Sequence, residues 1–320
     1  MNSIKKILSI LILLAAIPVL AAEKKAGPDT VKTGAYIISL HDINFHEKEY
    51  TIRFWLWMLH TNPDFNFSKQ VEIPNAKTLE DPDVMLDTIK GEIWTLMRMK
   101  ATMKQSWDVG NFPFDKQYLN VRIENTVFDA SKLIFQADTV GSNYDPKLTV
   151  DGWNIKDFKV STDTTNYNTA FGDPSYKVQK STYGNFMIDM TLEREAWGLF
   201  FKIFIGMYIA FMIASVTFLV DPEKMEPRVG LAVGGLFAAV GNKYIIDSLL
   251  PETSQFTLVD TLHTTTFLFI FFTVTFSALS PIWINQDLHI RAKRINKIGG
   301  WTITAVYIVT NIVMVLIAIF

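Results

Sequence analysis

The pattern of apolar and polar residues divides the chain into two parts near Trp197. Between residues 23 and 195 the apolar runs are short, often alternate with polar residues, and are interrupted by Pro, Gly, Asn and Asp. YTIRFWLWMLH and GNFMIDMTLERE have the pattern of strands, and turn sequences such as TNPD, EDPD, NYDP and FGDP recur between such runs. We therefore predict an antiparallel β-sandwich over residues 23–196.

Four long apolar segments follow, over residues 197–219, 229–250, 256–280 and 301–320. Each is long enough to cross a hydrocarbon core of ~30 Å. In an open-ended chain only helices satisfy their own backbone at that depth. The pattern thus predicts a transmembrane domain of four helices over residues 197–320.

The first 22 residues have the pattern of a signal peptide. Lys5 and Lys6 precede an apolar run over residues 7–20, and Ala21 and Ala22 offer a cleavage site. An uncleaved membrane anchor is the alternative. Because the run is short and contains Pro18, we favour cleavage.

The charges of the connecting loops predict the orientation of the spans. The link NQDLHIRAKRINKIGG, between the third and fourth spans, holds Arg291, Lys293, Arg294 and Lys297, and is expected in the cytoplasm. The link PETSQ, between the second and third spans, has no Lys or Arg and is expected outside. With four spans, the β-domain and the C-terminus are then both outside, in agreement with a signal peptide.

Composition and the absence of known motifs argue against several classes of function. A formal charge of −2 leaves no basic footprint for nucleic acid, and the absence of cysteine excludes disulfides and thiolate sites. The chain has no phosphate-binding loop, no nucleophile elbow and no paired metal motif, so we predict no enzyme, cofactor or metal. His41, His46 and His60 are expected near one hairpin, where zinc or proton binding is an alternative to solitary histidines.

The second span carries a face that a simple anchor does not need. At 100° per residue, seven positions fall within roughly 80° of one another. Lys243 and Asp247 lie off this face, four residues apart, and are expected to pair. The seven positions, here called the α-stripe, are Glu226, Gly230, Gly234, Phe237, Gly241, Tyr244 and Ser248.

Two interpretations of the α-stripe are open from the span alone. In one, Gly230 and Gly234 form a small-xxx-small pair at which two helices pack closely. In the other, several copies build a pore wall, with Glu226 ringing the inner mouth and Phe237 forming a constriction.

WDVGNFPFDKQ, over residues 107–117, resembles the signature loop of the pentameric ligand-gated ion channels, the Cys-loop receptor superfamily. Further segments resemble that family in the same order. DPKLTVDGWNIKDF resembles the strand before loop C, and FMIDMTLERE ends in Arg194, at the family's arginine before the first membrane helix. ASVTFLVDPE, PRVGL, Pro251 and FSALS match the ends of the first three spans. Gln105 and Leu119 stand where eukaryotic members have the loop cysteines, and the bacterial branch of the family also lacks that disulfide.

The resemblance covers about residues 33–320 and implies a homopentamer whose second span lines the channel. It favours the pore interpretation of the α-stripe. The expected protein is a ligand- or proton-gated channel of a bacterial inner (plasma) membrane, cation-selective through Glu226. Its expected partners are copies of itself, permeant inorganic ions, an unidentified small-molecule or proton agonist, and the bilayer. The alternative is a non-conducting, membrane-anchored binding or sensor protein of the same fold.

The resemblance also assigns residues to the junction between sandwich and membrane. Glu47 lies on the first hairpin turn, which points at the membrane in relatives. Asp115 and Arg194 are expected to meet there, with Pro113 and Pro251 nearby, and to couple the sandwich to the pore. A static ion-pair network that only holds the domains together is the alternative.

Relatives that bind amines use aromatic residues at subunit interfaces. Trp55 falls where the complementary face supplies its aromatic, and Tyr167, Phe171 and Tyr176 lie in the predicted loop C. Sandwich core is the alternative for Trp55, and a mobile, half-buried loop is the alternative for the other three. Leu79 and Thr126 stand at two further aromatic positions, so only part of the aromatic box is present and a simple amine is disfavoured.

Overall fold

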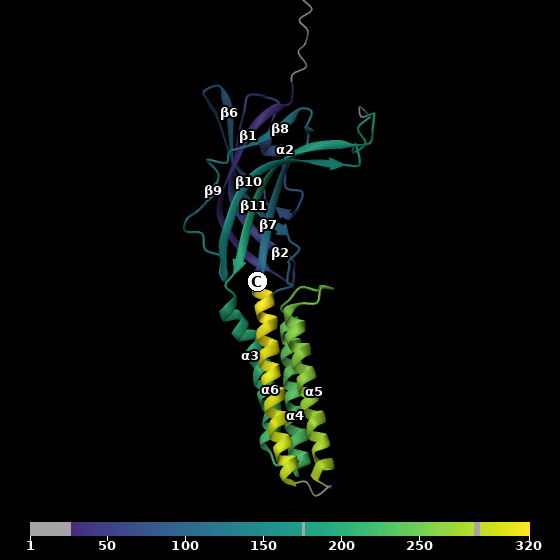
Figure 1. The fold of residues 1–320 in the computed structure, drawn as a ribbon. Coiled ribbons are helices and arrows are strands. Elements are labelled where there is room, and N and C mark those ends of the chain that lie inside the picture. Colours follow the sequence, from purple (N-terminus) through teal and green to yellow (C-terminus); the bar gives the residue numbers. More distant parts are fainter. Residues whose placement is uncertain (1–26, 175–176, 285–288) are drawn as a thin grey trace, which may run out of the picture.

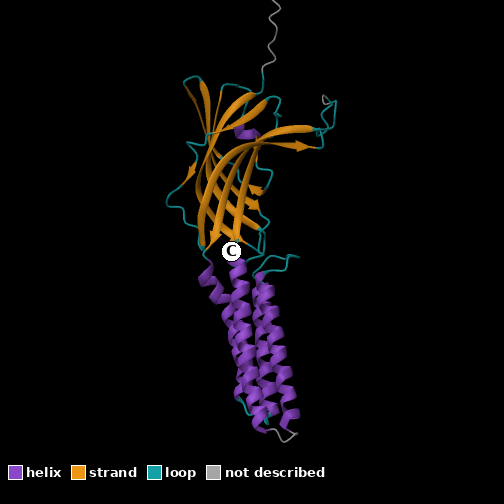
Figure 2. Cartoon of the chain, in the orientation of Figure 1, coloured by secondary structure: helices purple, strands orange, loops and turns teal. Residues whose placement is uncertain are grey.

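A computed structural model describes residues 27–174, 177–284 and 289–320. A β-sandwich stands on one end of a four-helix bundle, and the C-terminus returns to the junction between them (Figure 1; Figure 2). The predicted fold class is confirmed. The proposed signal peptide, residues 1–22, and Tyr176 lie outside the described residues.

The first sheet has seven strands in the order β4-β6-β2-β1-β8, with β5 paired to β6 and β9 to β1. β1 runs parallel to β8 and β9, and the other pairs are antiparallel. The strands are β1 (Asp29–Asn44), β2 (Glu49–His60), β4 (Ala76–Leu79), β5 (Asp83–Ile89), β6 (Glu92–Lys104), β8 (Leu133–Ala137) and β9 (Asn143–Tyr144).

The second sheet is fully antiparallel, in the order β10-β11-β7-β3. Its strands are β3 (Val71–Glu72), β7 (Lys116–Asn125), β10 (Trp153–Tyr167) and β11 (Ser181–Arg194), and the short helix α2 (Phe67–Gln70) precedes β3. The alternation of apolar and polar residues in the sequence matches which side chains of the strands are buried in the core. In β2, Phe54, Leu56 and Met58 are buried, whereas Trp55 and Trp57 point to the other face.

The histidines of the β1–β2 hairpin do not come together. His60 ends β2, eleven residues beyond Glu49, so it stands roughly 35 Å from the turn that holds His46. His41 contacts Asp42 at 2.7 Å. Among the described residues no cluster of His, Asp and Glu has the arrangement of a metal site.

Four helices in the described residues are long and apolar enough to cross a membrane. They are α3 (Ala196–Ser215), continued by the 3₁₀ turn η1 (Val216–Leu219), α4 (Met225–Asp247), α5 (Leu258–Ile284) and α6 (His289–Ile319). α4 packs against both α3 and α5, and α5 also packs against α6. α6 begins twelve residues before the apolar span read from the sequence, because Lys and Arg are good helix formers although they end the apolar run.

Candidate pore helix, coupling junction and ligand site

The α-stripe is the face of α4 that the protomer leaves unpacked. All seven of its residues are exposed, and Phe237 and Tyr244 are 72% and 79% accessible. The opposite face is buried against the neighbouring helices through Arg228, Ala232, Gly235, Ala239 and Ile246. The face identified from periodicity is therefore free to meet other copies of the chain or an aqueous axis.

The glycines of α4 have two different environments. A Cβ added at Gly230, Gly234 or Gly241 would meet nothing within 4 Å. At Gly235 it would lie 2.6 Å from the carbonyl oxygen of Ala210 in α3. Within the protomer, close helix packing thus uses Gly235, and the Gly230–Gly234 pair packs against no other helix.

These adjacent glycines give a matched test of which face is packed. Gly235→Ala is expected to cost about 1–3 kcal/mol of stability because the methyl group overpacks against α3. Gly234→Ala is expected to be neutral or to gain up to about 1 kcal/mol from helix propensity. Thermal unfolding of the two purified variants measures the difference. A larger loss for Gly234→Ala would mean that the packed face is assigned wrongly.

The charged residues of α4 point in different directions. Glu226 is exposed in the first turn, whereas Arg228 is fully buried and donates to Oδ1 of Asn296 in α6. Arg228 thus faces away from the α-stripe. At the other end the predicted Lys243–Asp247 pair is confirmed, and Asp260 of α5 joins it at 2.8 Å from the Lys243 Nζ.

A buried ion pair joins the start of β7 to the end of β11. The Arg194 guanidinium donates from Nε to Oδ1 of Asp115 at 2.6 Å and from Nη2 to Oδ2 at 3.0 Å. The two side chains are 10% and 2% exposed. The rings of Trp153, Phe45 and Phe112 surround the guanidinium at 4.0, 4.7 and 4.8 Å, an arrangement that favours a desolvated cation.

The signature loop also contacts the membrane helices. Phe114 packs against Trp197 and Phe200 of α3, with ring centroids 5.2 and 5.5 Å apart. The Leu258 amide at the start of α5 donates to the carbonyl of Gly110 at 2.8 Å. These side chains and backbone groups place the loop in contact with two helices at once.

The β1–β2 turn reaches the same junction from the other sheet. Lys48 Nζ donates to the carbonyl of Glu252, in the α4–α5 loop, at 3.0 Å. Pro113 and Pro251 are buried, and Glu47 is exposed. In the described part of the chain no hydrogen bond or ion pair joins Glu47 to Asp115 or Arg194. The hydrogen bond from this turn to the α4–α5 loop is therefore made by Lys48, a residue that the sequence analysis did not identify.

Three aromatic rings cluster at the base of the predicted loop C. Tyr167 contacts Phe171 and Tyr183 with ring centroids 5.4 and 5.8 Å apart. The backbone of Phe171 is left-handed, with φ 52°, a conformation that is strained for a bulky residue. In this conformation its ring contacts the other two rings of the cluster. The sequence did not predict that Tyr183, on β11, joins this cluster, because its place beside Tyr167 depends on the pairing of β10 with β11.

Acidic groups lie beneath these rings. The Tyr167 hydroxyl donates to Oε2 of buried Glu124 at 2.8 Å, and burial together with this carboxylate raises the pKa of Tyr167 to about 12. Glu124 also pairs with Arg122 at 3.0 Å. Partial burial and the facing Glu124 raise the pKa of Glu72 on β3. The cluster therefore combines ring faces with two facing carboxylates, Glu72 and Glu124, an arrangement that suits a cation or a proton.

Trp55 does not belong to the sandwich core. It is half-buried on the outer face of the first sheet, where the Arg98 guanidinium lies 4.6 Å from its ring. The core interpretation of this residue is wrong, because β2 buries its even-numbered neighbours instead. Trp55 and the Tyr167 cluster lie on different sheets, and no ring contact joins them within the described protomer.

Comparisons with known proteins agree with this architecture. No family model matches the chain. The chain is 20% identical over 315 residues to a proton-gated ion channel of Gloeobacter violaceus, covering 90% of this chain and 82% of that protein. It is 20% identical over 273 residues to a gamma-aminobutyric acid receptor subunit beta of Caenorhabditis elegans, covering 73% of this chain and 46% of that protein. These relatives are a channel and a receptor subunit, not enzymes. Both relatives are members of the pentameric ligand-gated ion channel (Cys-loop receptor) superfamily. The sandwich followed by four candidate spans in this cysteine-free chain matches the fold of that superfamily and fits a multi-pass membrane protein.

Proposed function

We propose that the protein is a ligand- or proton-gated, cation-selective channel that assembles as a homopentamer around α4. Homology to a proton-gated channel and to a receptor subunit supports a ligand-gated ion channel. The proposed location is the inner membrane of a bacterium, with the sandwich and the C-terminus on the periplasmic or extracellular side. The loop charges support this orientation.

The exposed α-stripe is the observation that carries the proposal. Acidic and hydroxyl groups that face lipid lose their water, and the cost rises with their depth in the bilayer. Copies arranged around a water-filled axis avoid these costs for Glu226, Tyr244 and Ser248. Within one protomer no helix packs against Gly230, Gly234 or Gly241, which leaves this face available to line such an axis.

The junction is proposed to transmit agonist binding to the pore. The Asp115–Arg194 ion pair joins the start of β7 to the end of β11. Three loops meet the helices near this pair: the signature loop with Pro113, the α4–α5 loop with Pro251 and the β1–β2 turn with Glu47. Lys48 contacts the α4–α5 loop, and Gly110 contacts the start of α5. These two contacts support a path from the junction to the end of α4.

The agonist is proposed to bind at the Tyr167–Phe171–Tyr183 cluster, with Tyr176 from the same loop and Trp55 from an adjacent copy. Glu124 and Glu72 beneath the rings favour a cation or a proton over an anion.

Because the chain has no cysteine, single introduced thiols test the pore without background. Phe237→Cys is expected to become reactive to a water-soluble methanethiosulfonate reagent and to lose current on modification. Ala239→Cys, which is buried on the opposite face of α4, and Ile312→Cys, on the outer face of α6, are the controls and should keep their currents. Native mass spectrometry in mild detergent should count five chains. A stable monomer or dimer, or equal effects at the three cysteines, would contradict the proposal.

A further inference from the structure

His60, the last residue of β2, has its imidazole enclosed by aromatic rings. The residue is 2% exposed. Its ring centroid lies 5.1 Å from that of Phe67, edge to face, and 5.6 Å from that of Phe65. Phe128 completes the cluster, 4.9 Å from Phe65. Phe67 begins α2, which lies in the part of the sandwich far from the membrane helices (Figure 1). A titratable side chain thus occupies an apolar site that neither the pore nor the agonist cluster uses.

The hydrogen bonds of this imidazole fit its neutral form. Nδ1 lies 2.8 Å from the carbonyl oxygen of Asn62, so Nδ1 carries a hydrogen and donates. Nε2 is buried and has no hydrogen-bond partner in the described part of the chain. A second proton, bound at Nε2, would place a cation with an unpaired N–H among phenyl rings. The attraction of a cation to a ring face offsets only part of that cost, because the charge has lost its water.

The charges around the ring do not offset the cost of a second proton. Charged side chains on the surrounding elements are Asp29 and Lys32 on β1, Asp64 in the turn after β2, Lys69 on α2, Glu92 on β6, and Asp129 and Lys132 after β7. Burial lowers the pKa of His60, the Asn62 carbonyl offsets part of this effect, and no charged group of the described chain contributes. The enclosed ring therefore binds a proton less readily than a free histidine, and acid favours any state in which the ring is released.

A short segment connects the ring to the carboxylates of the agonist cluster. Phe67 is the first residue of α2, and β3 follows α2 directly. On β3, Glu72 pairs with Glu124 of β7, the residue that accepts from Tyr167. Residues 67–72, here called the α2–β3 segment, thus contact the His60 ring at one end and the agonist cluster at the other.

We propose that His60 is a pH switch: the neutral imidazole holds the α2–β3 segment against the end of β2, and a proton from solvent at Nε2 releases the segment and loosens the pairing of Glu72 with Glu124. The switch acts on the carboxylates beneath the agonist cluster from outside that cluster. Its effect on the agonist site rests on the proposed function, whereas the release of the segment does not.

The test is amide hydrogen–deuterium exchange of the full-length protein in mild detergent, with the exchange rates corrected for their intrinsic dependence on pH. Between about pH 7.5 and about pH 5.5, opening of the α2–β3 segment is expected to increase about tenfold, because a released histidine gains its proton near pH 6.5 and the enclosed one does not. His60→Phe keeps a ring in the site and has no proton to gain, so its opening should not depend on pH. His46→Phe is the matched control, since His46 is exposed in the β1–β2 turn, and should keep the full increase.

Three outcomes would overturn the switch: the same pH dependence in His60→Phe as in the unmodified protein, no increase in the unmodified protein, or an increase spread evenly over the whole sandwich. The link to the agonist cluster is tested in the same spectra. Residues 124–126, at the end of β7, should open together with the α2–β3 segment, and unchanged exchange there would overturn the link. His60→Asn, which keeps an amide donor for the Asn62 carbonyl and cannot be protonated at this pH, replaces His60→Phe if the latter does not fold. Every readout is independent of whether the protein conducts, so a failure of the proposed function remains distinguishable.

Discussion

Arg194→Ala is expected to destabilise the protein by about 3–5 kcal/mol, because the change leaves the Asp115 carboxylate, 2% exposed, without its cation. The same change removes the guanidinium from the three rings that surround it. Thermal unfolding of the purified protein measures the stability. Currents evoked by acid steps, compared at equal surface expression, measure the coupling between sandwich and pore.

Glu193 provides the control for this prediction. It neighbours Arg194 on β11 and pairs with Lys116, the neighbour of Asp115, at 3.1 Å, and with Lys156 at 2.7 Å. The Glu193 side chain is 34% exposed and the two lysines 54% and 50%, so solvent screens these ion pairs and Glu193→Ala should cost less than about 1 kcal/mol. Arg194→Lys keeps the charge but loses the bidentate geometry, and is expected to fall between the two. Similar stability and currents in Arg194→Ala and Glu193→Ala would make Arg194 a bystander.

Glu226→Ala is expected to abolish most of the preference for cations. In the proposed pentamer, five copies of this exposed residue form a ring at the cytoplasmic mouth, where low-dielectric walls strengthen its field. The buried Arg228 does not cancel this ring, because its guanidinium is directed to Asn296 and away from the α-stripe. Reversal potentials in a sodium chloride gradient measure the selectivity.

The unmodified channel should reverse near the sodium equilibrium potential, and Glu226→Ala should reverse near zero. Glu223→Ala is the control, since Glu223 is exposed just before α4 begins. Its effect on the reversal potential should be smaller. Reversal of the unmodified channel near the chloride equilibrium potential would refute cation selectivity, and an unchanged Glu226→Ala would show that the acid ring is not its cause.

Short-range patterns in the chain were sufficient for the architecture. Alternation of apolar and polar residues with period two predicted the strands, and the length of the apolar runs predicted the membrane helices. Both patterns are local, because burial of one face of a strand, or of a whole helix in lipid, determines which positions of that element are apolar. The wheel of α4 identified the α-stripe, since the angle between two residues of a helix depends only on their spacing. The Lys243–Asp247 pair is likewise local.

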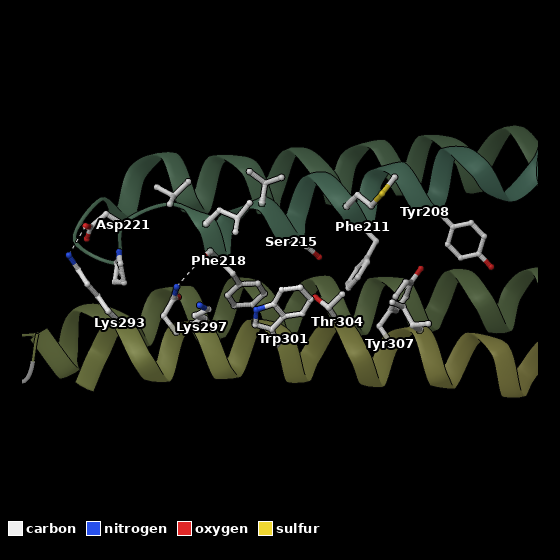
Figure 3. A pocket seen from close by; sticks show the side chains of 18 residues that line it. Tyr208, Phe211, Ser215, Phe218, Asp221, Lys293, Lys297, Trp301, Thr304 and Tyr307 are labelled. Carbon is white, nitrogen blue, oxygen red and sulfur yellow. Dashed lines mark hydrogen bonds and ion pairs between the residues drawn. The ribbon is translucent and has the colours of Figure 1, made fainter. Parts of the chain in front are cut away.

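Contacts between elements were decided only by the tertiary structure. Gly234 and Gly235 are adjacent residues of one type, and the position of α3 makes the second a close-packing residue. The choice of Lys48 over Glu47 at the junction, and of Glu124 and Tyr183 as neighbours of Tyr167, depends on strand pairing over many residues. A groove lined by Lys297 lies between η1 and α6, which approach closely at Gly300 (Figure 3). Because these segments are far apart in the chain, no pattern within one of them predicts the groove.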